Sequence, residues 1–210
     1  MPFLGHPRRS LYRVGIVTLL LTACSRRNTG PYSEPALRAE LLSRVARDQA
    51  VRDTFQVQLR QTGTITPALF ASMSRVDSAN FLWLREVVRS QGFPTHAQVG
   101  RDGVAAATLL VQHADAAPDF QGEMLPTFEA LHRSGDVTGQ ELALLTDRVA
   151  KARGRPQRYG SQTTIVDGKV IIDPIEDSAG VDARRRALGL PPLAEYKRVL
   201  DSLYAREGGR

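Results

Sequence analysis

Val104–Gln121, which reads VAAATLLVQHADAAPDFQ, is the segment around which the rest of the chain is organised. Its first eight residues are apolar apart from one threonine, a composition that predicts a helix enclosed by protein on every side. Polar side chains follow at once, and they are Gln112, His113, Asp115 and Gln121. Burying such groups costs free energy unless they are hydrogen-bonded. The segment therefore predicts a buried helix that carries polar groups to an interior site.

His113 admits three interpretations from the sequence alone. It is a structural histidine bonded to a buried carboxylate, a general base or proton shuttle, or a metal ligand, and an imidazole near acids suits acid–base chemistry at neutral pH. Asp115 precedes Ala-Ala-Pro118, which favours a helix cap and first turn. The helix expected from about 118 to 133 has Gln121 at the edge of its apolar face.

Two expected helices before this segment carry polar residues within their apolar faces. The helix from about 35 to 60, with Ser33 as its capping hydroxyl, places Asp48 and Arg52 inside its stripe. The helix from about 68 to 90 does the same with Asp77 and Asn80. A surface ion pair contributes roughly 0.2–0.5 kcal/mol, whereas a core-facing one is costly unless other polar groups complete it. We therefore expect one shared polar cluster.

The C-terminal part continues the helical pattern and adds one hairpin. Residues 95–103 are expected to be a loop, and Thr138 opens a capping box for a helix to about 151, with Arg148 on the margin of its apolar face and Asp147 off it. β-Branched runs at 163–166 and 169–172 flank Asp-Gly, the strongest short-range hairpin signal. A short helix ends at Gly189, and a last one opens at Pro191-Pro192. The sequence predicts a mainly α, single compact multi-helix domain with one short β-hairpin near residues 163–172.

The N-terminus has the pattern of a bacterial lipoprotein signal. Three arginines precede the apolar run VGIVTLLLTA at 14–23, which is too short to span a membrane as a stable helix. Leu21-Thr-Ala-Cys24 resembles a lipobox, and Cys24 is the only cysteine, which favours lipidation over a free thiol. Ser25 is not the aspartate that signals inner-membrane retention, so the resemblance favours the outer membrane. We expect a signal peptide at 1–23, a lipidated tether at 24–33 and a helical domain at 34–207.

Charge and composition limit the possible partners. The net charge is +6, and removing three arginines with the signal leaves +3. Basic residues cluster at 151–158 and 184–186, which we interpret as solvated helix ends, so we do not expect nucleic acid as a partner. We expect membrane attachment through the lipid, no metal and no cofactor. The sequence does not predict a protein partner.

The motifs together resemble a bacterial domain family of unknown function whose members are often secreted or lipid-anchored. They are D-x-x-x-R at 48–52, Q-H-A-D at 112–115, D-R-V at 147–149, Q-x-Y-G-S-Q at 157–162 and the R-x-x-L-G-L-x-x-L-x-x-Y run at 185–196. Family members often have threonine in place of Ser161. The similarity spans about residues 36–200, so it implies a domain boundary and a set of residues but no reaction.

Three functions from different classes are compatible with these residues. The first is a binding module for a polar ligand such as a sugar, a peptide or a cell-wall fragment, since amides and guanidinium groups give directional hydrogen bonds. The second is a hydrolase in which His113 acts with Asp48 or Asp77, although no strong catalytic motif is present. The third is a structural envelope protein with a satisfied polar core. The ligand-binding candidates are Arg52, Asn80, Gln112, Asp115, Gln121, Arg148, Gln157, Tyr159, Ser161 and Gln162.

Overall fold

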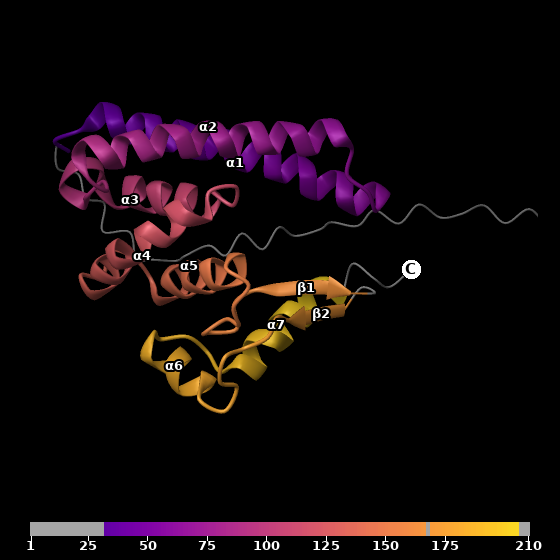
Figure 1. Ribbon diagram of the computed structural model, residues 1–210. Coiled ribbons are helices and arrows are strands. Elements are labelled where there is room, and N and C mark those ends of the chain that lie inside the picture. The colour runs from indigo at the N-terminus through magenta and orange to yellow at the C-terminus, as the bar shows by residue number, and fades with distance from the viewer. Residues whose placement is uncertain (1–31, 167–168, 206–210) are drawn as a thin grey trace, which may run out of the picture.

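The computed structural model describes residues 32–166 and 169–205, and it confirms the mainly α fold. Within these residues lie seven helices and one two-stranded hairpin (Figure 1). The segment expected to be a signal peptide, Cys24 and the expected tether up to residue 31 lie outside the described residues, as do Asp167 and Gly168. The helices are α1 Pro35–Thr62, α2 Pro67–Gln91, α3 His96–Gln112, α4 Pro118–Arg133, α5 Gly139–Ala152, α6 Val181–Ala187 and α7 Leu193–Ala205.

Helices α1 and α2 form a long antiparallel pair along one side of the domain (Figure 1). Both begin with a proline, which the first helical turn tolerates because its N–H would be unpaired there. Thr66 caps α2 by accepting a hydrogen bond from the Leu69 amide. The predicted cap of α1 is wrong, because the Ser33 hydroxyl donates to the Ala97 carbonyl instead. The pair brings the polar stripes of α1 and α2 face to face.

The expectation of a loop at 95–103 is also wrong. The Thr95 amide donates to the Gln98 side chain at 2.9 Å, and this contact starts helix α3 eight residues earlier than Val104. Gly100 interrupts the helix with a left-handed φ of 73°. A Cβ there would lie 2.7 Å from the Tyr32 ring, so glycine is required for both conformation and space. The glycines are visible in the sequence, but the sequence does not reveal that the chain is helical both before and after Gly100.

The buried character of α3 is as predicted. Val104, Ala107 and Val111 are completely buried, although Ala105 is exposed. The neighbouring helices supply further completely buried side chains, namely Leu41, Leu84, Phe128 and Leu145. Helix α3 packs on α1, α2, α4 and α5. Its C-terminal end therefore opens into the middle of the helical assembly.

The C-terminal elements are built onto α5. The capping box at its start is confirmed, with the Thr138 amide donating to Glu141 at 2.7 Å. Gly139 touches the end of α6 so closely that a Cβ would lie 1.9 Å from the Leu188 carbonyl oxygen. Strands β1 Thr163–Val166 and β2 Lys169–Ile172 pair antiparallel with the predicted bounds. Helix α7 packs on β2 and gives the ribbon the support that an isolated hairpin lacks.

Candidate functional site

The three helices α1, α2 and α3 bring four charged or titratable side chains together, and we call this set the polar cluster (Asp48, Arg52, Asp77 and His113). The Asp48 carboxylate lies 2.9 and 3.0 Å from His113 Nδ1. Arg52 Nη2 donates to Asp77 Oδ1 at 2.7 Å and lies 3.3 Å from Asp48 Oδ1. The shared cluster expected from the helix stripes therefore exists.

Whether His113 Nδ1 carries a proton decides which hydrogen bonds form in the polar cluster. Arg52 Nε also lies 3.0 Å from Nδ1, but one nitrogen cannot both donate to Asp48 and accept from Arg52. Asp48 is completely buried, so its carboxylate needs donors. We therefore assign Nδ1–H as a donor to Asp48, with Arg52 held by the two aspartates. This tautomer leaves His113 Nε2 with a lone pair.

The polar cluster is partly open. Side-chain exposure is 24% for Arg52, 20% for His113 and 18% for Asp77, against none for Asp48. Within the described part of the chain, no hydrogen bond is made by His113 Nε2, Arg52 Nη1 or Asp77 Oδ2. Three hydrogen-bonding positions are thus left beside a buried carboxylate, with two acceptors and one donor among them.

The two carboxyl groups of the polar cluster have pKa values shifted in opposite directions. Burial acts to raise the pKa of Asp48, but the hydrogen bond from His113 and the positive charges beside it outweigh burial and hold the pKa below 3.8. For Asp77, burial dominates and the Asp48 charge adds to it, so its pKa is raised above 3.8 despite Arg52. Asp48 is therefore the ionised anchor and Asp77 the more easily protonated group.

These shifts predict opposite pH dependences for Asp48→Asn and Asp77→Asn. Asp48 has a lowered folded pKa, so its contribution to stability is present above 3.8 and is lost as pH falls through that folded pKa. Asp77 has a raised folded pKa, so its contribution is fully present below 3.8 and is lost as pH rises through the raised folded pKa. We expect the destabilisation by Asp48→Asn to shrink on acidification and that by Asp77→Asn to grow.

Urea denaturation of both variants at a series of pH values from about 3 to 7 measures how each destabilisation depends on pH. Asp53→Asn is the control, because Asp53 is an exposed carboxylate of the same helix. Parallel pH profiles for Asp48→Asn and Asp77→Asn would contradict the assigned directions.

Asn80 lies beside the polar cluster in the seam between α1 and α2. Its Oδ1 accepts from Arg44 Nη1 at 3.3 Å, two helical turns of α1 before Arg52. The residue is 5% exposed, and its Nδ2 has no partner in the part of the chain that the structure describes. The predicted inward orientation of Asn80 is confirmed. Its amide adds a polar group between α1 and α2 but does not contact His113.

A second set of candidates lies just beyond His113, where α3 meets α4 and α5. Gln121 is almost completely buried and donates to the Val111 and Gln112 carbonyls at 3.1 and 3.2 Å. Gln112 in turn donates to the Glu141 carbonyl at 2.7 Å. The two side-chain amides thus tie the end of α3 to α4 and α5, and they fix the position of the backbone that carries His113.

Asp115 does not cap α4, because the N-cap position belongs to Ala117. Its carboxylate instead accepts from Arg148 Nη1 at 2.6 Å, with side-chain exposures of 62% and 27%. This ion pair ties the α3–α4 turn to α5. An exposed pair of this kind contributes roughly 0.2–1 kcal/mol, so it positions the turn without dominating stability.

The remaining candidates form a separate network around Asp147. This residue is completely buried, so the expectation that it lies off the apolar face of α5 is wrong. Its carboxylate accepts from the amides of Arg158 at 2.7 Å, Tyr159 at 2.9 Å and Ser161 at 2.8 Å. Gly160 makes the turn possible with a φ of 72°. A single carboxylate thus closes the loop at 157–162.

Two further side chains complete this loop. Gln157 is 1% exposed, accepts from the Gln162 amide at 2.8 Å and donates to the Gln162 and Asp173 carbonyls. Arg185, also 1% exposed, donates to the Tyr159 carbonyl at 2.6 Å and to the Pro191 carbonyl at 2.7 Å. Within the described residues, no hydrogen bond or ion pair joins the loop to the polar cluster. The loop is a structural network.

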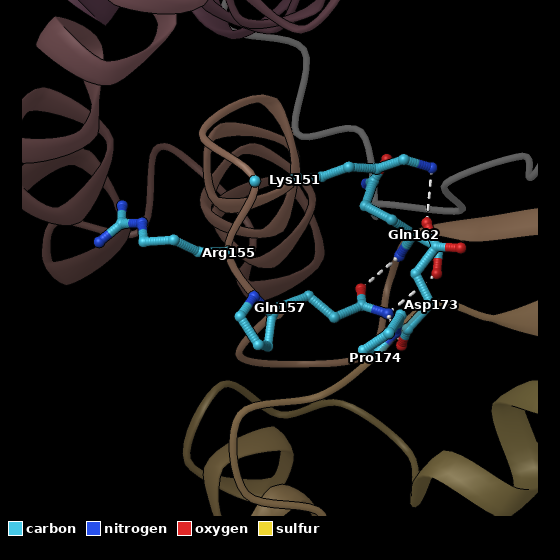
Figure 2. A pocket seen from close by; sticks show the side chains of 8 residues that line it. Lys151, Arg155, Gln157, Gln162, Asp173 and Pro174 are labelled. Atoms are coloured by element: carbon cyan, nitrogen blue, oxygen red, sulfur yellow. Dashed lines mark hydrogen bonds and ion pairs between the residues drawn. The ribbon is translucent and has the colours of Figure 1, made fainter.

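A small cavity of about 300 Å³ lies beside this loop, between the end of α5 and the base of the hairpin. Figure 2 shows Lys151, paired with Asp173 at 2.5 Å, and the side chains of Gln157 and Gln162, while the Arg155 side chain points away from the others. His113 and Arg52 do not line it. Of the ligand-binding candidates, Gln157 and Gln162 do, so the cavity is distinct from the polar cluster.

Asp147 and Arg185 are the buried charges that the sequence interpretation missed. An acid two residues from the apolar positions Leu145 and Val149 resembles a solvated helix position, because its partners are backbone amides of a distant loop. In residues 32–166 and 169–205, no group of three His, Cys, Asp or Glu side chains is arranged to hold a metal ion. Over the same residues, none of the helices is long and apolar enough to cross a membrane.

The fold and these networks define a mainly helical domain with charged groups in its interior. The chain belongs to the family of unknown function DUF6624, whose model matches residues 35–207. Neither the curated proteins nor the solved structures contain a match to this chain. Family membership thus identifies the domain without assigning a reaction.

Proposed function

We propose that the protein is a lipid-anchored envelope lipoprotein whose helical domain binds a polar ligand at the polar cluster. The supporting observation is that Arg52, Asp77 and His113 are partly exposed while keeping hydrogen-bonding atoms without a protein partner. By contrast, the Asp147 carboxylate is completely buried and accepts from three backbone amides, so it presents no atom to a ligand. The open positions make binding the better-supported function.

The anchoring part of the proposal is supported by the sequence of the N-terminus. A processed Cys24 would carry acyl chains, which give stable membrane attachment when more than one is present. The tether would place the domain at the periplasmic face, with the outer membrane favoured by Ser25. Fractionation after Cys24→Ser tests this directly: the variant is expected to leave the membrane fraction. A processed variant that stays membrane-bound would overturn it.

The Asp48–His113 contact favours a second candidate, a hydrolase. Asp48 orients the ring through Nδ1, and Nε2 would take a proton from water as the water oxygen attacks the substrate. The Arg52 guanidinium would stabilise the negative charge that develops on the attacked group. This candidate requires turnover that depends on His113. If His113→Ala leaves all detectable turnover unchanged, the hydrolase candidate is excluded.

The binding proposal predicts that Arg52→Ala and His113→Ala lose a co-purifying ligand while the protein stays folded. Removing one charge-assisted hydrogen bond is expected to weaken binding by at least about tenfold. Native mass spectrometry of the purified full chain measures ligand retention, and thermal unfolding measures stability. Arg47→Ala is the matched control, because Arg47 is an exposed arginine of α1 outside the cluster. Equal retention in all four proteins would favour a purely structural role.

A further inference from the structure

The exposed ion pair of the polar cluster is electrically compensated. Arg52 and Asp77 carry opposite charges and contact each other at 2.7 Å. The Asp48 carboxylate is completely buried behind His113, which donates to it through Nδ1. A ligand therefore meets a compensated ion pair and an imidazole, not an unpaired charge.

This arrangement disfavours a charged ligand of either sign. An anion that approaches Arg52 also meets the Asp77 carboxylate and, behind it, the Asp48 charge. A cation that approaches Asp77 meets the Arg52 guanidinium at the same short range. In both cases the ligand loses hydration and gains an attraction that the neighbouring like charge offsets.

The open positions instead match groups that donate and accept hydrogen bonds at once. His113 Nε2 and Asp77 Oδ2 accept, and Arg52 Nη1 donates. A pair of hydroxyl groups serves all three, since each hydroxyl donates one hydrogen bond and accepts others. Phe81 lies one turn from Asp77 on the same face of α2, where its ring packs against Phe120 and lies 5.0 Å from the Arg85 guanidinium.

We infer that the polar cluster binds a neutral, hydroxyl-rich ligand, a saccharide without ionised groups. The inference rests on the proposed function and narrows it from polar ligands in general to one class. Asp77 and Arg52 then act as specificity residues that reject charged counterparts by mutual compensation. Removing one of them should create a preference for the ligand charge that it had rejected.

The experiment compares three disaccharides that differ in charge. They are N,N′-diacetylchitobiose, which is neutral, chitobiose with free amines, which is cationic, and a uronic-acid disaccharide. Isothermal titration uses the full lipidated chain in a detergent without a sugar headgroup, because a maltoside or glucoside would compete. The neutral disaccharide is expected to bind about tenfold tighter than either charged one, the loss that follows one poorly paired charge-assisted hydrogen bond.

Two variants make the result decisive. Asp77→Asn should weaken the neutral disaccharide and strengthen the uronic acid, while Arg52→Ala should strengthen the amine. Glu86→Gln, an exposed acid of the same helix, is the matched control and should change nothing. Tighter binding of a charged disaccharide, or no binding by any of the three, would overturn the inference. If a charged disaccharide binds and Arg52→Ala abolishes that binding, the polar cluster is still a ligand site and only the inference about neutral ligands fails. If none of the disaccharides binds and the Arg52→Ala and His113→Ala variants retain the co-purifying ligand as the wild type does, both the inference and the proposed function fail.

Discussion

Asp147→Ala is expected to lower the free energy of unfolding by about 3–5 kcal/mol, the lower end of the summed losses at three buried backbone amides. The carboxylate accepts from three backbone amides of the loop at 157–162, and alanine would leave all three without their acceptor. Each buried amide left unpaired costs roughly 1–3 kcal/mol.

Urea denaturation and thermal unfolding measure this effect, and the melting temperature should fall by roughly 10 °C for a domain of this size. Asp147→Asn should lose less, because an amide oxygen still accepts one of the hydrogen bonds. Asp53→Ala, which removes an exposed carboxylate, provides the baseline. A loss below about 1 kcal/mol, the value of one ordinary hydrogen bond, would show that the three amides find other partners.

Arg185→Met is expected to have the second largest effect, a loss of about 2–3 kcal/mol for two buried carbonyls left without donors. The guanidinium donates to the Tyr159 and Pro191 carbonyls and lies 4.9 Å from the centre of the Tyr196 ring. Burial lowers the pKa of Arg185, which shows that its charge is costly here. Methionine keeps much of the volume and removes that cost, so the loss should stay below that of Asp147→Ala.

A double-mutant cycle tests whether the two charges act on the same peptide segment. Asp147 accepts from the Tyr159 amide and Arg185 donates to the Tyr159 carbonyl, so the two side chains hold this residue from both sides. Once one of them is removed, the loop is already loosened and the second removal costs less. We expect a coupling of about 1–2 kcal/mol, within the range for residues of one network. Additive losses from Asp147→Ala and Arg185→Met would show that they stabilise separate parts of the chain.

The helices and the hairpin were largely predictable because their signals are local. Apolar periodicity, the prolines at the starts of α1, α2 and α4 and the capping box at Thr138 depend on residues a few positions apart. The structure reproduces the predicted bounds within two or three residues for most helices. The exception is residues 95–103, where two glycines within four positions suggested a loop. One of them interrupts the helix and the other is packed inside it, and only the fit against Tyr32 and Val99 distinguishes these cases.

The candidate site was predictable in part for the same reason. Helical periodicity places Asp48 and Asp77 inside apolar stripes, and two such stripes on neighbouring helices must face each other. The sequence places the loop at 157–162 among the same candidates because its motif is polar and belongs to the same family resemblance. The polar groups of this loop form hydrogen bonds within the loop and with its immediate neighbours. The spacing of residues in the sequence does not reveal these partners.

By itself, the sequence determined that the chain folds into amphipathic helices around an apolar one, and that acids and an arginine point inward at Asp48, Arg52 and Asp77. These properties follow from the angle between successive side chains on one helix. Only the tertiary structure decided the partners, because a hydrogen bond depends on a few ångströms between residues far apart in the chain. His113, within Val104–Gln121, is thus hydrogen-bonded to Asp48 of another helix. Asp147 has the sequence spacing of a solvated helix position, but in the structure it is buried and accepts hydrogen bonds from the backbone of a separate loop.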